Sequence, residues 1–234
     1  MINYKIFISL LLGVCALSPA TQKSAPTFSS DFTSLALWRD DSTKGSPKSY
    51  EIIDKEKGLL RMSTRAGTKD RVKVATKQKF FAGKYTWRVF VPEMGVGDQA
   101  SIGAFLYQDD LHEVDFEIGY GTKKLRKDLG AKEDQLVCYL TSQGFPHSTT
   151  QVLLEREKWH ECSIKISHTK NDKYLVEWFL NSVKVKALQT DFSDETEFVA
   201  VCSVENLSFL GDHLPSRDNY AIFDYFEFRE ISKE

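Results

Sequence analysis

Three acidic side chains at alternate positions are the clearest candidates for chemistry in this chain. They are Glu113, Asp115 and Glu117, in the run LHEVDFEIG over residues 111–119. Because successive side chains of a β-strand point to opposite faces, a strand here places all three carboxyl groups on one face and the intervening apolar residues on the other. Carboxyl groups held together on a rigid strand can act as an acid and base pair.

Two other interpretations of the triplet stay open. The residues could form the solvated face of an amphipathic strand, the commoner arrangement on spacing alone, although stacked like charges repel and a solubilising face relieves that cost by including lysine. The same oxygens could bind a hard cation, but such sites usually use an irregular loop, so a structural calcium is not predicted. The five histidines are scattered, and none pairs with a cysteine at zinc-site spacing. We therefore predict no metal and no cofactor.

The segments around the triplet predict an all-β chain. Alternating polarity recurs with turn residues between the segments, and amphipathic helical periodicity is hard to find. The clearest predicted strands cover residues 83–91, 159–166, 174–180 and 220–230. Several of them are apolar on nearly both faces, which favours two packed sheets, as in a sandwich or jelly roll.

Three local features follow from the same pattern. Asn181 and Ser182 predict a tight hairpin, because Asn tolerates a left-handed backbone. The charged residues 122–134 predict a solvated surface loop, with contact to anionic saccharide groups as the less favoured alternative. In the last predicted strand, one face is expected to carry Ile222, Asp224, Phe226 and Phe228 and the other face Phe223 and Tyr225.

Length and charge limit the class of protein. The 234 residues, 41% of them hydrophobic, suffice for one sizeable core but not for two ordinary domains with linkers. Lys and Arg number 31 and Asp and Glu number 33, giving a formal net charge of -2. The net charge therefore does not favour binding to nucleic acid or to a membrane surface. We expect a neutral partner and a monomeric protein.

The N-terminus is predicted to be a removable secretory signal, residues 1–20. Lys5 precedes an apolar run over residues 6–17, and Ser18 and Ala20 supply the small residues that a signal peptidase requires. The run is shorter than the roughly 20 apolar residues that span a bilayer. The mature protein is therefore expected to be secreted or periplasmic, without membrane insertion.

The cysteines suggest no disulfide framework. Lipid anchoring through Cys15 is disfavoured by the bulky Val14 before it. The predicted mature domain, residues 21–234, keeps an odd number of cysteines in apolar, strand-like contexts, namely Cys138, Cys162 and Cys202. At most one disulfide can form among them, and buried free thiols are the preferred interpretation.

The acidic strand resembles the Glu-x-Asp-x-Glu signature of glycoside hydrolase family 16, the retaining β-glucanases and galactanases with a concanavalin A-like jelly roll. Other segments resemble the strands of that family in the expected order: residues 31–38, 81–89 (FAGKYTWRV), 159–160 with 178–181, and 222–226. The resemblance spans nearly the whole mature chain. It implies an all-β jelly-roll sandwich of two antiparallel sheets.

The resemblance also implies a role for each acidic residue. Glu113 would be the nucleophile, Glu117 the proton donor and later the base, and Asp115 would tune their protonation. Retention requires carboxyl groups about 5 to 5.5 Å apart, and like charges that close do not both ionise readily. Residues four apart on a flat strand have Cα atoms roughly 13 Å apart, so the two glutamates must converge through strand curvature and side-chain reach.

Aromatic rings are the second ingredient of a saccharide cleft, because the C–H faces of sugar rings stack on them. The candidate substrate-binding residues are Tyr107, Tyr120, Tyr139, Phe209 and His213. Trp87, Trp159 and Trp178 lie in alternating strands, and for each of them a core position is at least as favoured as a place in a cleft.

Three positions depart from the family pattern. Leu111 stands where many members carry Trp, residues 198–203 replace a strand that often reads Asn-Leu-Trp, and Cys138 falls where some members place Asn. Two functions follow. The first is a secreted retaining endo-glycosidase that hydrolyses a polysaccharide, a β-linked glucan or galactan, and the intact triplet favours it. The alternative is a non-catalytic polysaccharide-binding protein on the same jelly roll, which the missing aromatic residues favour.

Overall fold

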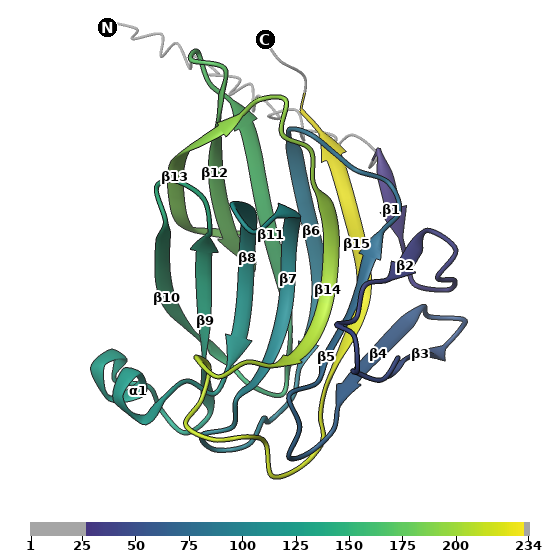
Figure 1. The fold of residues 1–234 in the computed structure, drawn as a ribbon, viewed down its shortest axis with the longest axis vertical. Coiled ribbons are helices and arrows are strands. Elements are labelled where there is room, and N and C mark those ends of the chain that lie inside the picture. Colours follow the sequence, from purple (N-terminus) through teal and green to yellow (C-terminus); the bar gives the residue numbers. More distant parts are fainter. Residues whose placement is uncertain (1–26, 232–234) are drawn as a thin grey trace, which may run out of the picture.

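Two antiparallel β-sheets lie face to face in the computed structural model, which describes residues 27–231 (Figure 1). This arrangement confirms the predicted two-sheet jelly-roll sandwich. The predicted signal, residues 1–20, and the first residues of the predicted domain lie outside the described range. Within that range no helix is long and apolar enough to cross a membrane.

The two sheets differ in size and strand order. The eight-stranded sheet has the order β13 (Val183–Ser193), β12 (Lys173–Leu180), β11 (Lys158–His168), β6 (Gly83–Val91), β15 (Asn219–Glu230), β4 (Leu59–Thr64) and β3 (Tyr50–Asp54), and β1 (Phe28–Ser30) also pairs with β15. The seven-stranded sheet has the order β10 (Ser148–Glu155), β9 (Gln135–Ser142), β8 (His112–Gly119), β7 (Ala100–Asp109), β14 (Val199–Asn206), β5 (Arg71–Thr76) and β2 (Trp38–Asp40). The acidic strand β8 is thus an inner strand of its sheet, next to the central strand β7.

Alternation along each strand builds the core between the sheets. In β6 the side chains that face the core are Tyr85, Trp87, Val89 and Val91, and in β11 they are His160, Cys162, Ile164 and Ile166, as the sequence pattern predicts. Removing large apolar side chains of this kind from water contributes about 1.5 to 3 kcal/mol each. The facing strands of both sheets contribute to one continuous apolar cluster.

Strand β15 departs from simple alternation. Phe223, Phe226 and Phe228 are all buried in the core, whereas Ile222 and Tyr225 lie on the outer face. A register shift between Phe223 and Tyr225 marks a β-bulge against β6. A bulge adds one residue to the strand and so reverses which face the later residues occupy. The prediction that Phe223 and Phe226 lie on opposite faces of the strand was therefore wrong.

The charged segment 122–134 contains a short helix, α1 (Lys123–Leu129), so the prediction of an entire loop was wrong. Thr122 caps its first turn, and Gly130 ends it in a left-handed conformation. Arg126 is buried, and its guanidinium donates hydrogen bonds to three backbone carbonyls, those of Tyr120, Lys132 and Gln135. This arginine fastens the segment to the sheet and does not face solvent.

Two smaller predictions are confirmed. Asn181 and Ser182 connect β12 to β13 with φ values of 50° and 68°, which is the doubly left-handed turn that suits a two-residue hairpin. The three described cysteines are free and buried: Cys138, Cys162 and Cys202.

Candidate active site

The three acidic residues share one face of β8. The apolar side chains that alternate with them are buried in the core: Val114, Phe116 and Ile118. Glu113, Asp115 and Glu117 therefore point to the face of the seven-stranded sheet that is turned away from the core. Pairing with β7 on one side and β9 on the other holds the strand rigidly in place.

Glu117 lies between two cavities on this outer face. Glu113 and Glu117 both line a cavity of about 380 Å³, and Asp115 and Glu117 both line a cavity of about 260 Å³. The two glutamates thus open into the same space, as a pair that acts on one bond must. A saccharide chain that occupies both cavities would pass over the Glu117 carboxyl group.

Neighbouring side chains orient two of the carboxyl groups. Ser101 on β7 donates a hydrogen bond from its hydroxyl to Oε2 of Glu117. Gln143, directly after β9, donates from Nε2 to Oδ2 of Asp115 at 3.4 Å. Among the described residues, Oδ1 of Asp115 has no hydrogen-bond partner although it is buried. The site therefore gives the ionised form of Asp115 little hydrogen-bond stabilisation.

A glycine makes room for the Glu117 carboxyl group. Gly103 on β7 pairs with Glu117 across the β7–β8 ladder. A Cβ atom at position 103 would lie 2.3 Å from the Ser203 hydroxyl and 3.1 Å from Oε1 of Glu117. Any side chain there would displace one of these two groups.

Burial raises the pKa of all three carboxyl groups. It raises the pKa of Glu113 to about 7 and that of Glu117 to about 8, and in both cases the negative charge of Glu205 adds to the effect. It raises the pKa of Asp115 well above its usual range, with further contributions from the two glutamates. Within the glutamate pair, Glu117 holds its proton to the higher pH, which suits a proton donor.

Sequence reasoning missed a fourth carboxyl group at this site. Glu205 on β14 is 1% exposed, lines the larger cavity and forms an ion pair with Arg71 on β5. Lys73, also on β5, lines the same cavity, and its charge lowers the pKa of Glu113. Residues 199–206 form a strand that pairs with β7. If the sequence had been interpreted in this way, the alternation of Val201, Ser203 and Glu205 would have predicted the Glu205 carboxyl group on the outer face.

Three of the aromatic candidates lie beside the carboxyl groups. Tyr107 pairs with Glu113 across the β7–β8 ladder and lines the larger cavity. Tyr139 pairs with Glu117 across the β8–β9 ladder and lines the smaller cavity. Phe209 lines that cavity too, and its ring meets the Tyr139 ring edge-on with centroids 5.7 Å apart. These rings give each cavity an apolar wall.

The other two candidates lie elsewhere. The Tyr120 ring lies under the Arg126 guanidinium, 3.9 Å from it, and lines neither cavity. His213 lies beside Asp98, with 3.5 Å between Nδ1 of the histidine and Oδ1 of the aspartate, and it also lines neither cavity. The structure therefore gives these two residues no contact with the acidic group.

The tryptophans and Cys138 belong to other parts of the sandwich. Trp87 and Trp178 are fully buried in the core, and the half-buried Trp159 lies on the outer face of the eight-stranded sheet. Cys138 is buried in the core as well, so it does not occupy the place of a cleft residue. Leu111 is 67% exposed at the turn before β8. The cleft walls are therefore made by Tyr and Phe.

In the described part of the chain, no group of three or more His, Cys, Asp or Glu side chains has an arrangement that could hold a metal ion. The prediction that the protein uses no metal or cofactor stays a prediction.

Solved structures share this fold. The chain matches a Crh5 transglycosylase bound to NAG with a TM-score of 0.62 and 19% identity, covering 89% of this chain and 85% of that one. It matches the laminarinase catalytic domain of Thermotoga maritima with a TM-score of 0.61 and 12% identity, covering 89% and 99%. It matches a GH16 protein of Bacteroides ovatus, in complex with a G4G4G3G product, with a TM-score of 0.62 and 13% identity, covering 86% and 99%.

No family model and no curated protein matches the sequence. At 12 to 19% identity, the structural likeness establishes that this chain has the fold of those glycoside hydrolase family 16 structures. A shared fold does not by itself specify function, which depends on the residues of the site.

Proposed function

We propose that this protein is a secreted retaining endo-glycosidase that hydrolyses the O-glycosidic bonds of a β-linked glucan or galactan. The observation that carries the proposal is the pair Glu113 and Glu117, which open from one strand into one cavity. Both have a raised pKa, and that of Glu117 is the higher. A solvated acidic face would not bury its carboxyl groups in this way.

The proposed chemistry has two displacement steps. In the first, the ionised Glu113 attacks the anomeric carbon while Glu117 donates its proton to the departing glycosidic oxygen, leaving a glycosyl ester on Glu113. In the second, Glu117 takes a proton from water, whose oxygen attacks the anomeric carbon and releases Glu113 as a carboxylate. The sugar is released with its original configuration, and both glutamates return to their starting protonation states.

Asp115 is assigned a tuning role in this scheme. It lies between the two glutamates on the strand, and burial together with their charges keeps its pKa well above its usual range. A neutral Asp115 adds no third negative charge to the cluster. It therefore leaves Glu113 free to ionise.

The proposed substrate is a neutral polysaccharide that is cleaved internally. Cavities lie on both sides of Glu117, so sugar units can bind on either side of the cleaved bond. Tyr107 on one side, and Tyr139 with Phe209 on the other, supply rings on which sugar faces can stack. The structural neighbours include a laminarinase and a beta-glucanase, which supports a β-glucan as the first substrate to test.

A non-catalytic polysaccharide-binding role is the alternative. It is favoured by the absence of tryptophan from the walls of both cavities, because tryptophan provides the largest stacking surface for a sugar ring. It is disfavoured by the energetic cost of burying three neighbouring carboxyl groups, which saccharide binding alone does not require.

The deciding experiment measures new reducing ends after the purified protein is incubated with β-glucans, xyloglucan and galactans. We expect release from at least one polysaccharide, and a loss of about 10³-fold or more in Glu113→Gln and Glu117→Gln. NMR of the first product should show the β-anomer. The matched control is Glu133→Gln, which removes an exposed glutamate outside the site and should keep full activity.

Two results would count against the proposal. Equal release by wild type and Glu113→Gln would remove these residues from the chemistry. Binding of a polysaccharide without release of any reducing ends would instead support the non-catalytic role.

A further inference from the structure

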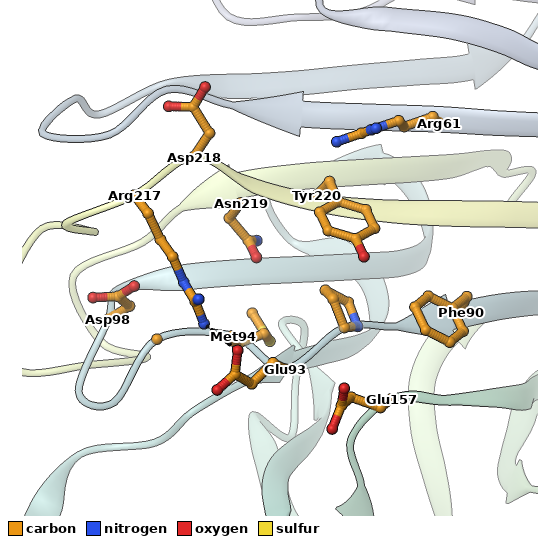
Figure 2. A pocket seen from close by; sticks show the side chains of 12 residues that line it. Arg61, Phe90, Glu93, Met94, Asp98, Glu157, Arg217, Asp218, Asn219 and Tyr220 are labelled. Carbon is orange, nitrogen blue, oxygen red and sulfur yellow. Dashed lines mark hydrogen bonds and ion pairs between the residues drawn. The ribbon is translucent and has the colours of Figure 1, made fainter.

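A third cavity, of about 400 Å³, is lined by strands of the eight-stranded sheet and by the loops next to them (Figure 2). Arg61, Phe90 and Tyr220 line it, from β4, β6 and β15 of the eight-stranded sheet. Each of the three alternates with buried core residues of its own strand, so each points to the outer face of that sheet. The acidic group of β8 lies on the outer face of the other sheet, so the two sites are separate.

Aromatic rings stand at one end of this cavity. Phe90 and Tyr220 lie there, and Figure 2 shows both at the end away from Asp98. The Phe90 ring also meets the Trp159 ring on the neighbouring strand β11, with centroids 5.6 Å apart. The Arg61 guanidinium lies 4.5 Å from the centre of the Tyr220 ring. The outer face thus carries aromatic rings on three neighbouring strands.

Buried polar atoms that lack a hydrogen bond stand on the same cavity. Asn219 is 6% exposed and lines it, and its Nδ2 atom has no hydrogen-bond partner among the described residues. Figure 2 shows its side chain pointing from β15 towards the segment that carries Glu93 and Met94. Asp98 is 2% exposed, and its Oδ1 atom makes no hydrogen bond either, although His213 lies 3.5 Å away. A buried donor without a protein acceptor leaves a hydrogen bond that water or a ligand group can complete.

The charges of the cavity disfavour an anionic ligand. Two cations line it, Arg61 and Arg217, together with the four acidic residues Glu93, Asp98, Glu157 and Asp218. Arg217 is already engaged, because it donates to Glu93 at 2.8 Å. An anionic ligand would therefore meet more negative than positive charge. A ligand with many hydroxyl groups can both donate to the carboxylates and accept from the amide and guanidinium groups.

We propose that this cavity is a second saccharide-binding site, which holds another stretch of the same neutral polysaccharide that the cleft binds. Sugar C–H faces would stack on Phe90 and Tyr220, while Asn219 donates to a sugar oxygen. The identity of the polysaccharide rests on the proposed function, but the existence of the site does not. A long chain can occupy both faces of the sandwich at once, whereas a short oligosaccharide occupies one site at a time.

The test uses the full protein with Glu113→Gln as the parent, so that the polysaccharide is bound without being cleaved. Its affinity for a long soluble β-glucan is measured by affinity gel electrophoresis. We expect Tyr220→Ala, Phe90→Ala and Arg61→Ala each to weaken that affinity, the two ring deletions by about tenfold. The matched control is Phe179→Ala, which removes a half-buried ring from the outer face of β12 in the same sheet.

Folding and cleft function are checked separately. Arg61 is exposed, so Arg61→Ala removes a cavity group at little risk to the fold, and thermal unfolding of every variant is compared with that of the parent. In the active protein, Tyr220→Ala should leave kcat/KM for a short soluble oligosaccharide unchanged. It should lower the rate on insoluble polysaccharide.

The outcomes separate the two proposals. Unchanged affinity in folded Tyr220→Ala and Arg61→Ala, or equal weakening in Phe179→Ala, overturns the second site even if the enzyme is active. Weakened affinity in the cavity variants alone establishes the second site, even if the wild-type protein cleaves none of the polysaccharides tested.

Discussion

Glu205 controls how tightly Glu113 and Glu117 hold their protons. Its charge raises the pKa of both residues, and its partner Arg71 lowers them. In Glu205→Gln the negative charge is lost and the guanidinium is left unpaired, so both changes lower the two pKa values. We expect the whole profile of kcat/KM against pH to move about one unit towards acid.

Arg71→Gln is the matched control for that prediction, because it removes the opposing charge from the same ion pair. It should move the profile towards alkaline pH. The wild-type profile should be centred between the pKa of Glu113, about 7, and that of Glu117, about 8, since the proposed mechanism requires the first ionised and the second protonated. Shifts of the same sign in the two variants would show that Glu205 does not act through its charge.

At the level of single residues, the sequence predicts the acidic triplet but not its surroundings. Glu113, Asp115 and Glu117 are recognisable because one short run contains all three. Glu205 is separated from them by about 90 residues of chain, and only the pairing of β14 with β7 brings it to the site. Charges that meet through sheet pairing leave no local spacing in the sequence to detect.

The close packing of side chains across β7, β8 and β14 depends on one residue without a side chain. Gly103→Ala would place a methyl group 2.3 Å from the Ser203 hydroxyl and 3.1 Å from Oε1 of Glu117. The Ser203 hydroxyl must then move away, and the Glu117 carboxyl group must shift by a few tenths of an ångström. A displacement of about 1 Å can cost on the order of 10²-fold in rate, so for this smaller shift of the proposed proton donor we expect a loss on the order of tenfold in kcat, measured on whichever polysaccharide the wild type cleaves.

Gly67→Ala separates this effect from general destabilisation. Gly67 has a φ of 64° with nothing within 4 Å of an added Cβ, so the substitution strains an exposed turn that lines neither cavity of the candidate site. It should lower the melting temperature and leave kcat unchanged. If Gly103→Ala kept wild-type kcat, Glu117 would not depend on the space that Gly103 leaves.

The β12–β13 hairpin allows the prediction of a substitution that stabilises the folded protein. Ser182 holds a φ of 68°, a conformation that glycine adopts without strain and serine does not. Ser182→Gly should raise the free energy of unfolding by about 0.5 to 1 kcal/mol, measured by urea denaturation. Asn181→Gly should instead destabilise, because the Asn181 side chain accepts a hydrogen bond from the backbone of Glu161 at 2.9 Å. Destabilisation by Ser182→Gly would contradict the turn geometry.

At the level of elements, alternation predicts a strand but not its interruptions. It correctly assigns the buried faces of β6 and β11. It fails in β15, where the bulge between Phe223 and Tyr225 changes the face of every later residue. Both faces of that strand carry aromatic residues, so polarity gave no sign of the change. The helix α1 was not predicted, because seven residues are too few to display helical periodicity.

The molecule as a whole explains why the aromatic residues were harder to place than the carboxyl groups. A two-sheet sandwich has one buried layer and two outer faces, and a tryptophan in an alternating strand can occupy either. Trp87 and Trp178 lie in the core, whereas Trp159 lies on the outer face of the eight-stranded sheet. Three carboxyl groups on one side of a strand have no such freedom, because they cannot enter an apolar core together.

The buried carboxyl groups also make the stability of the whole molecule depend on pH. In the folded state the pKa of Glu113 is raised to about 7, that of Glu117 to about 8, and that of Asp115 well above its usual range. Between about pH 5 and 8 the folded state therefore binds more protons than the unfolded state. The free energy of unfolding must fall as the pH rises through this window, by up to about 1.4 kcal/mol per pH unit for each such group.

Substitution of one group tests this directly. Glu117→Gln cannot ionise, so its free energy of unfolding should fall less steeply between pH 5 and 8, and it should exceed that of the wild type at pH 8. Above that pH, stability should gain a contribution that rises with pH in both proteins, because burial lowers the pKa of Lys186 to about 8. Urea denaturation at steps of half a pH unit measures the slope of the free energy of unfolding against pH. The control is Glu133→Gln, which changes an exposed glutamate and should keep the wild-type slope. A wild-type stability that rises from pH 5 to 8 would mean that the three carboxyl groups are ionised in the folded protein, and the assignment of Glu117 as proton donor would fail with it.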